Sequence, residues 1–274
     1  MCCDGDAGRW SRLSFSRDQP NRYRNTVACD KDFSQEETAP GLADMQPHLF
    51  VVAVTQRGAM PYRCVASSPE GLVQQVAVCY LRHGYWWYVT GRIPKDKDYE
   101  AVDQKLIAKY EIDLSERQRA FRKKRGLANM QYIRYRNWFL LLVTEGHHPF
   151  KQEERHCIRD CRRNPIKFEG YSISYRRAGV TPTGGGKPKW HACVRIDPTT
   201  YKQLKAFFLE RACHRSVDHL AADFARVPYA RFAPIRRQLL TIQRSVNNAR
   251  SKLGYEKIPA SALRLRRKIQ RPFS

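Results

Sequence analysis

Residues 130–144 read MQYIRYRNWFLLLVT, and this stretch decides the fold. Two strand-like segments, 130–135 and 138–144, flank the pair Arg136-Asn137 in the manner of a β-hairpin. The second segment is apolar on both faces of an extended chain. A strand of that kind has to be covered on both sides, so it is predicted to lie centrally in a sheet.

Helices and one more strand are predicted before this hairpin. The segment YWWYVTGRI at 85–93 is rich in aromatic and β-branched residues, which is typical of a strand. Helices are predicted over residues 69–83, 99–110 and 116–125. The first has Ser68 as its N-cap, a proline in its first position, and Gly84 as its end signal.

After the hairpin the pattern continues with a helix, two strands and an all-helical end. The predicted elements are a basic helix over 151–163, strands over 167–176 and 190–196, and helices over 198–213, 216–228 and 235–253. A glycine-rich loop at 183–188 joins the two strands. The last helix carries an apolar seam with spacings of three and four. This seam either docks on the sheet domain or lets the chain self-associate as a coiled coil.

The order of elements predicts an α+β fold, a mostly antiparallel sheet with a split β-α-β core, followed by a basic all-helical C-terminal region. We divide the chain into a disordered N-terminal head at 1–46, an α+β nucleic-acid-binding domain at 47–197 and a basic helical region at 198–274. The head is polar and aperiodic, and the first strand-like segment after it is LFVVAV at 49–54.

The net charge points to the partner. The chain has 50 Lys and Arg against 26 Asp and Glu, for a net of +24. Residues 1–50 hold six basic and eight acidic residues, which leaves +26 for the remainder. A cationic surface attracts polyanions because each Lys or Arg near a phosphate releases condensed counterions. Nucleic acid, DNA or RNA, is therefore the expected partner.

The sequence gives little support for a membrane, secreted or nucleotide-binding protein. No apolar run approaches the length of a membrane span, so we expect a soluble protein with no membrane partner. The chain start lacks the pattern of a secretory signal. Nine cysteines without a regular framework suggest reduced thiols and a cytoplasmic location, in a nucleoid or a ribonucleoprotein. The Gly-rich loop lacks the spacing of a nucleotide-binding motif.

Cationic residues gather in several segments that we expect to contact nucleic acid. Residues 115–177 hold 16 basic and six acidic residues, and residues 228–274 hold 12 basic and one acidic residue. The predicted binding residues are Arg122, Lys123, Lys124, Arg125, Arg134, Arg136, Arg162, Arg163, Arg176, Arg177, Arg264, Arg266, Arg267 and Lys268. These contacts are expected to go to the backbone, because no base-reading motif is visible.

Aromatic residues interleave with two of these arginines on the 130–144 hairpin. Tyr132, Tyr135 and Trp138 alternate with Arg134 and Arg136. In one interpretation the guanidinium groups reach phosphates while the rings stack on unpaired bases. In the other, the rings point into the core and the arginines solvate the opposite face.

One pattern suggests catalysis. His147 and His148 follow the apolar strand, and a later helix carries Tyr201 near its start. The order of strand, helices, histidine-bearing strand and tyrosine-bearing helix resembles the HUH class of metal-dependent single-strand nucleases and transposases. The resemblance implies that His147 and His148 hold Mg²⁺ or Mn²⁺ and that Tyr201 is the nucleophile. The chain departs from that class because its histidines are adjacent and would face opposite ways on a regular strand.

Other residues compete for these roles. Tyr171 and Tyr175 are alternative nucleophiles. Cys157 and Cys161 would share a helix face and could bind zinc with nearby histidines, but no Cys-x-x-Cys pair is present, so structural zinc is not expected.

The sequence thus predicts a basic nucleic-acid-binding protein that serves replication, transposition or another mobile-element process, or a ribonucleoprotein. The alternatives are the tyrosine-dependent nuclease and a structural RNA-binding protein that clamps folded RNA by shape.

Overall fold

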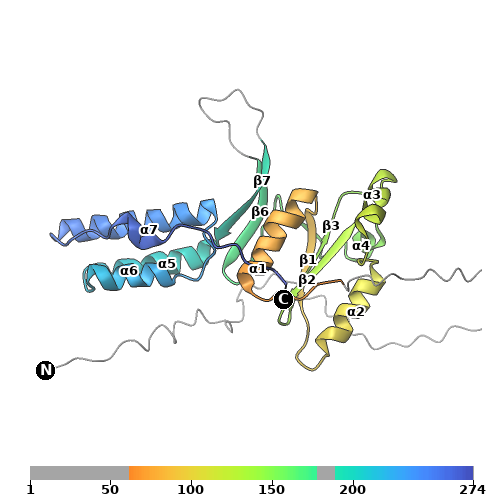
Figure 1. The fold of residues 1–274 in the computed structure, drawn as a ribbon, viewed down its shortest axis with the longest axis horizontal. Helices are drawn as coiled ribbons and strands as arrows, with labels where there is room; N and C mark the ends of the chain where they lie inside the picture. The colour runs from red at the N-terminus through yellow and green to blue at the C-terminus, as the bar shows by residue number, and fades with distance from the viewer. Residues whose placement is uncertain (1–61, 178–188, 274) are drawn as a thin grey trace, which may run out of the picture.

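A computed structural model describes residues 62–177 and 189–273. The predicted disordered head at 1–46, the strand-like segment at 49–54 and the glycine-rich loop at 183–188 lie outside these residues. The described part has both helices and antiparallel sheets, so the α+β class is confirmed (Figure 1).

The first sheet contains the hairpin that the sequence pointed to. Its strands are β1 (Trp87–Arg92), β2 (Met130–Tyr135), β3 (Trp138–Val143) and β4 (Arg159–Asp160). Their order is β2-β3-β1-β4, and every neighbouring pair is antiparallel. Because β3 pairs with both β1 and β2, those two strands run parallel to each other. The chain passes between them through α2 (Tyr99–Lys109) and α3 (Glu116–Lys124).

Both faces of this sheet are buried, as the apolar sequence of β3 predicts. Leu140 and Leu142 belong to a large core cluster that includes the helix after Ser68. Leu141 and Val143, which point the other way, pack in a second cluster with Phe150 of α4 (Pro149–Glu153). Alternate side chains of one strand therefore fill two cores, and the central position of β3 is confirmed.

The predicted helix over residues 69–83 is one continuous helical segment that combines three types of helix. It consists of α1 (Pro69–Gln74), a π-helical turn (Gln75–Tyr80) and a 3₁₀ turn (Leu81–His83). Ser68 caps its start by accepting a hydrogen bond from the Gly71 amide, and Gly84 ends it at a φ of 92°. This segment contacts both β2 and β7 and so lies between the two sheets.

The second sheet differs from the prediction at its start. It contains β5 (Ile166–Phe168), β6 (Tyr171–Arg177) and β7 (Trp190–Ile196), all antiparallel. The single strand predicted over 167–176 is wrong, because Glu169 and Gly170 adopt φ angles of 43° and 74° and form a two-residue hairpin turn. A β-carbon at Gly170 would also meet the Tyr229 hydroxyl at 2.3 Å.

The basic helix predicted over 151–163 is also wrong. Helix α4 ends at Glu153, and Arg159–Asp160 instead pairs with the edge of β1 as β4. The Asp160 carboxylate accepts a hydrogen bond from the Arg162 amide at 2.8 Å, which fixes a turn where the helix was expected. Pairing with a neighbouring strand has overridden local helix propensity.

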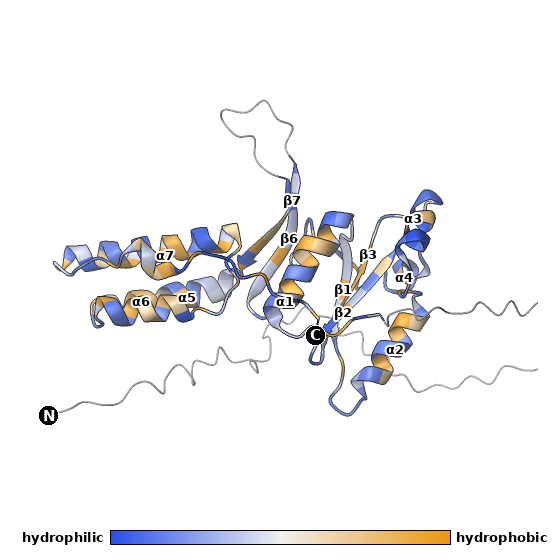
Figure 2. Ribbon diagram, in the orientation of Figure 1, coloured by the Kyte–Doolittle hydropathy of each residue, from blue (hydrophilic) through white to orange (hydrophobic). Residues whose placement is uncertain are grey.

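Three helices form an arm beside the second sheet (Figure 1). They are α5 (Pro198–Arg211), α6 (Val217–Arg226) and α7 (Ala233–Lys252), as the sequence predicts. In each of them hydrophobic and hydrophilic residues interleave (Figure 2). Gln238 ties α7 to β7 by accepting from the Ile196 amide at 2.9 Å and donating to its carbonyl at 3.1 Å.

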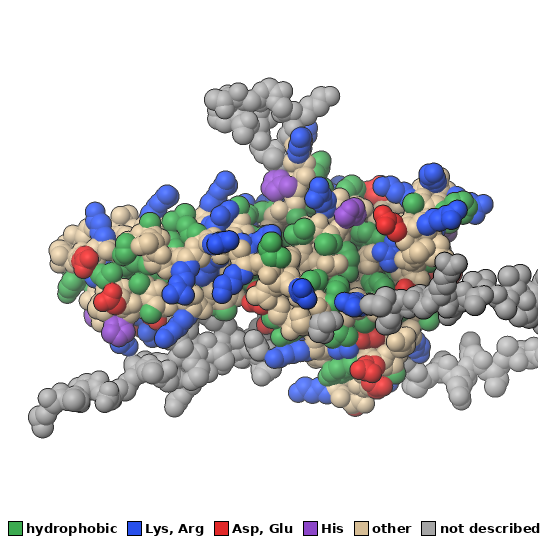
Figure 3. Space-filling view, in the orientation of Figure 1, with side chains coloured by type: hydrophobic (Ala, Val, Ile, Leu, Met, Phe, Trp, Pro, Cys, Tyr) green, Lys and Arg blue, Asp and Glu red, His purple; other side chains and the backbone are tan. Residues whose placement is uncertain are grey.

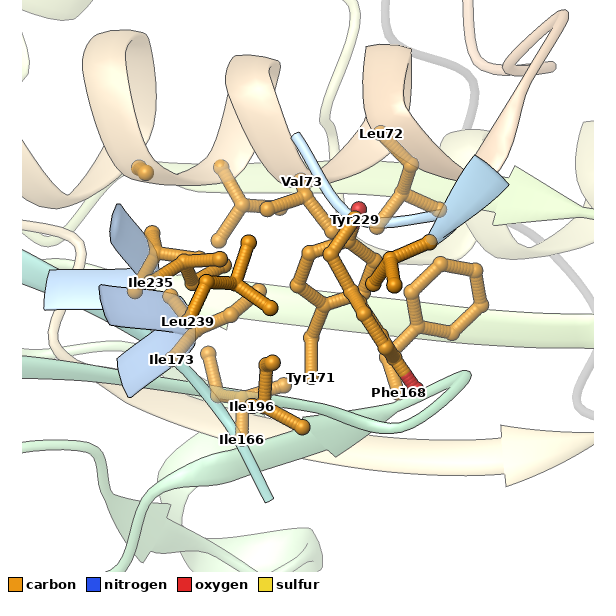
Figure 4. Packing of buried hydrophobic residues seen from close by; sticks show 14 of the residues in the cluster. Leu72, Val73, Ile166, Phe168, Tyr171, Ile173, Ile196, Tyr229, Ile235 and Leu239 are labelled. Carbon is orange, nitrogen blue, oxygen red and sulfur yellow. The ribbon is translucent and has the colours of Figure 1, made fainter. Parts of the chain in front are cut away.

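The apolar seam of α7 is occupied within this chain. Ile235 and Leu239 converge with Ile173, Ile196 and Tyr171 under α1 (Figure 4). Ile242 and Val246 are fully buried further along the helix, whose next neighbour is α5. Docking within the chain is therefore the observed arrangement for these four residues, whereas Leu253 at the end of the seam is 64% exposed.

The chain after α7 returns to the first helix. A 3₁₀ turn (Ala260–Leu263) buries Leu263, and the following residues run back toward α1. There the Gln74 amide group donates to the Gln270 carbonyl at 2.9 Å, and the Ser67 amide donates to the Pro272 carbonyl at 2.9 Å. The tail thus links the helical arm to the start of the described chain. Within the described ranges, no helix is long and apolar enough to cross a membrane.

Candidate nucleic-acid interface

The arginine that was expected to reach phosphate from the β2–β3 hairpin is buried. Arg134 is 5% exposed, and its guanidinium donates to both carboxylate oxygens of Asp103 in α2 at 2.7 to 2.9 Å. The hydroxyl of the fully buried Tyr132 donates to the same carboxylate. Because α2 covers this face, Arg134 is half of a buried ion pair and is not available to a nucleic acid.

The rings of the same hairpin face the core. Tyr135 and Trp138 pack against Phe168 of β5, with ring centroids 6.0 and 4.5 Å apart. Arg136 is exposed in the turn, where its φ is 54° and its guanidinium lies 5.4 Å from the Tyr135 ring. The interpretation in which these rings stack on bases is therefore replaced by the one in which they build the core.

Most of the other predicted binding residues are exposed. This group contains Lys123, Lys124, Arg125, Arg163, Arg176, Arg177, Arg264, Arg266 and Lys268. Three are half-buried and held by neighbours: Arg122 pairs with Glu111 at 2.6 Å, Arg162 pairs with Asp160 at 2.8 Å, and Arg267 lies 4.7 Å from the Phe232 ring. Lys and Arg side chains are spread over the face seen in Figure 3, where acidic side chains are few.

The two adjacent histidines lie in different surroundings. His148 is buried, and its Nδ1 accepts the Phe150 amide at 3.1 Å, so its side chain caps α4. Burial, assisted by the nearby Arg122, lowers the pKa of His148. His147 is exposed. The pair does not present two nitrogen atoms to one site.

Tyr201 lies far from both histidines. It is half-buried near the start of α5 and packs against the large core cluster, whereas His148 packs beside Tyr110 of the second cluster. Helices α5 and α4 stand at opposite ends of the molecule (Figure 1). Burial raises the pKa of Tyr201, which opposes formation of the phenolate nucleophile.

The cysteines proposed as zinc ligands do not share a helix face. The expected helix is absent at Cys157 and Cys161, and Cys161 is fully buried after β4. Burial raises the pKa of Cys161 to about 12, so its thiol stays protonated. Among the residues that the structure describes, no three His, Cys, Asp or Glu side chains are grouped closely enough to hold a metal ion.

A different set of residues forms the most suggestive surface feature, which we call the aromatic stack. It consists of Arg162, Trp86, Tyr175 and Trp190. The Arg162 guanidinium carbon lies 4.5 Å from the Trp86 ring centroid. The rings of Trp86 and Tyr175 are 5.6 Å apart with planes at 25°, and those of Tyr175 and Trp190 are 5.8 Å apart at 12°. These are offset-stacked geometries, so the guanidinium and the three aromatic rings form one continuous stack.

Backbone and side-chain bonds hold the aromatic stack in place. The Cys161 amide donates to the Trp86 carbonyl at 2.9 Å, and the Tyr175 amide donates to the Cys161 carbonyl at 3.4 Å. The Trp86 indole donates to the Leu81 carbonyl at 3.1 Å. Arg162 is oriented by Asp160 and by Glu145, 3.5 Å away. The stack is therefore fixed by bonds from both sheets before any ligand arrives.

The open end of the stack lies among cations. Trp190 is 50% exposed, and it pairs in the sheet with the exposed Arg177. Arg176 and His191, which form the next pair, are exposed on the opposite face of these strand ends, and Lys189 just before β7 is exposed as well. The outer ends of β6 and β7 are pale to hydrophilic in colour (Figure 2). An unpaired base could stack on the free surface of Trp190 while its phosphates meet these side chains.

The sequence singled out Arg176 and Arg177 but not the rings beside them. The signal is present in the strings Tyr175-Arg176-Arg177 and Lys189-Trp190-His191, which place one ring among cations on each strand. It is the same kind of signal that the β2–β3 hairpin gives. The contact with Trp86, which comes from the segment before β1, distinguishes the two.

Comparison with known proteins gives no relative: no family model, no curated protein and no solved structure matches this chain.

Proposed function

We propose that this protein binds single-stranded nucleic acid on the aromatic stack and the cations around its open end. The observation that carries the proposal is a half-exposed Trp190 at the end of a preformed stack, with Arg177 beside it on the same face and Arg176 and Lys189 exposed at the same end of the sheet. Stacking of one base on an aromatic side chain contributes about 1–3 kcal/mol and tolerates any base. The cations supply salt-dependent affinity for the backbone.

The charge distribution supports the same function. The net charge of +24 exceeds what a solvated surface needs, and exposed cations also occur at the end of α3 and along the tail. Contacts of this kind position a strand without reading its sequence. We extend the proposal to a role in replication, transposition or another mobile-element process, or in a ribonucleoprotein. We also propose that β1, α2, α3 and β2 form a split β-α-β core, with β3 lying between β1 and β2.

The test is a pair of substitutions at one position. Trp190→Ala should weaken binding to unpaired DNA or RNA by about 5–150-fold, the equivalent of 1–3 kcal/mol. Trp190→Phe keeps a ring and should stay within a few-fold of the wild type. Leu253→Ala is the control, because Leu253 is another exposed apolar side chain, 64% exposed, at the end of α7. Fluorescence anisotropy on single strands and duplexes of equal length gives the affinities.

Two results would contradict this proposal. One is an unchanged affinity for single strands in Trp190→Ala, which would mean that no base stacks there. The other is an equal loss on duplex, or a preference for folded RNA over every unpaired strand. The second pattern would favour the structural RNA-binding alternative, in which the protein recognises shape.

The strand-nicking nuclease is the remaining alternative, and the positions of His148 and Tyr201 weigh against it. A tyrosine nucleophile leaves a covalent protein adduct on DNA when a cation stabilises the transition state. Incubation with labelled single-stranded DNA and Mg²⁺ or Mn²⁺ should therefore give no denaturant-resistant band. A band that disappears in Tyr201→Phe and in the double change of His147 and His148 to Ala would establish the nuclease.

A further inference from the structure

A pocket lined with cations lies where β7, the start of α7 and the tail meet. Its volume is about 420 Å³. Five of its lining residues carry basic side chains: His191 from β7, Arg231 from the segment before α7, Arg236 and Arg237 from α7, and Arg267 from the tail. Among the described residues that line it, none is acidic. Basic residues from four parts of the chain thus line one cavity.

Carbonyl oxygens hold the buried arginine of this pocket. Arg231 is 8% exposed, and its guanidinium donates to the carbonyls of Phe224, Val227 and Tyr229 at 2.9 to 3.3 Å. No carboxylate within the described ranges forms an ion pair with it. Carbonyl oxygens satisfy its N–H groups but leave its charge in place, and an uncompensated buried charge is unfavourable. A bound anion would supply the missing charge.

Helix α7 adds to the positive potential. The Ala233–Lys252 helix has no acidic residue in its first turn and no side chain that caps its amides. Arg236 and Arg237 are exposed close to this end, where the helix dipole favours negative charge. The positive end of the helix dipole repels these arginine side chains in the empty protein. A bound anion would be attracted by both and would offset that repulsion.

The pocket is also next to the aromatic stack. Ala192 lines the pocket and lies two residues from Trp190 on the same face of β7. Arg267, which also lines the pocket, is held against the Phe232 ring at 4.7 Å, and the tail that carries it is fixed to α1 by Gln270 and Pro272. A strand that stacks on Trp190 therefore has the pocket at its next step.

We propose that this pocket binds a terminal phosphate of a nucleic-acid strand, an inference that rests on the proposed single-strand binding. A terminal phosphate is a monoester with a charge near −2 at neutral pH, whereas each internal phosphodiester carries one negative charge. Several converging arginines with no acid among them favour the more highly charged group. A pocket of this volume is large enough for a phosphate with part of its nucleotide.

The experiment compares oligonucleotides that differ only at one end. Internally labelled single strands with a 5′-phosphate, a 3′-phosphate or hydroxyls at both ends are bound to the wild type, to the double variant Arg236→Ala with Arg237→Ala, and to Arg244→Ala. Arg244 is an exposed arginine of the same helix that does not line the pocket, so it is the matched control. One phosphorylated end should bind at least fivefold more tightly than the hydroxyl strand in the wild type and in Arg244→Ala. The double variant should lose that advantage.

A second measurement separates the pocket from the strand. Inorganic phosphate and pyrophosphate should raise the thermal midpoint of the wild type and of Arg244→Ala above that in chloride of equal ionic strength, and should not do so for the double variant. Equal affinity for all three strands would overturn the terminal-phosphate site while leaving single-strand binding intact. If no strand binds, the proposed function fails, and with it the terminal-phosphate site. A shift with inorganic phosphate alone would then identify a pocket for free phosphate instead.

Discussion

The β2–β3 and β6–β7 hairpins both carry arginines close to tyrosine and tryptophan, but they expose different side chains. In the first, Arg134 pairs with Asp103 inside the molecule, and Tyr135 and Trp138 pack on Phe168. In the second, Arg176 and Arg177 are exposed, and the rings of Tyr175 and Trp190 pile outward from Trp86.

The difference arises from what covers each hairpin. Helices lie on both faces of the first sheet, so the polar groups of β2 had to find partners inside it. The outer ends of β6 and β7 extend past the helices (Figure 1), so their cations remain in solvent. Arginines beside aromatic residues are thus compatible with a buried or an exposed hairpin, and the elements that cover the hairpin decide which of these side chains face solvent.

The largest expected effect is on stability and concerns the buried ion pair. Arg134→Ala leaves the Asp103 carboxylate buried and unpaired, so the free energy of unfolding should fall by about 3–5 kcal/mol. Urea denaturation followed by circular dichroism measures this change. Arg136→Ala, two residues away and exposed, should change stability by less than about 0.5 kcal/mol. Similar values for the two variants would show that the hairpin is not covered as described.

The next effect is on binding and compares one exposed arginine from each hairpin. Arg177→Ala should make the slope of log affinity against log salt shallower by about 0.7, the value for one phosphate contact on a single strand. Arg136→Ala should leave the slope unchanged, because its hairpin is outside the proposed interface. Titrations at several salt concentrations measure both slopes. An equal change in Arg136→Ala would extend the interface to the β2–β3 turn.

The smallest effect separates the buried from the exposed histidine. Because burial lowers the pKa of His148 below its ordinary 6.5, the unfolded chain takes up a proton first as the pH falls. The stabilising contribution is complete above about pH 6.5 and is lost below it, with a slope of at most about 1.4 kcal/mol per pH unit. His148→Asn keeps an N-cap acceptor and should remove this part of the pH dependence.

The control for that measurement is the adjacent residue. His147→Asn should leave the pH dependence of unfolding as in the wild type, since His147 is exposed. Thermal or urea unfolding between pH 5 and 8 gives both profiles. If the pH dependence persists in His148→Asn, other titratable groups cause it.

The sequence by itself determined the class of fold and most of its elements. Caps and terminators such as Ser68, Gly84 and Ser115 act on their own helices, and they predicted these elements correctly. The central place of β3 followed from side chains that are apolar on both faces. The net charge predicts a polyanionic partner, and this prediction needs no structure because the charge is a sum over residues and does not depend on their arrangement.

Tertiary structure alone decided which charges and rings face outward. Arg134 lies opposite Asp103 because α2 covers β2, and Trp86 reaches Tyr175 because Cys161 joins two sheets through its backbone. Both are contacts between residues distant in the chain, and no local pattern encodes them. The same limit explains the error at residues 151–163, where pairing with β1 replaced a helix. Local propensities are worth a few tenths of a kcal/mol per residue, and a long-range pairing outweighs them.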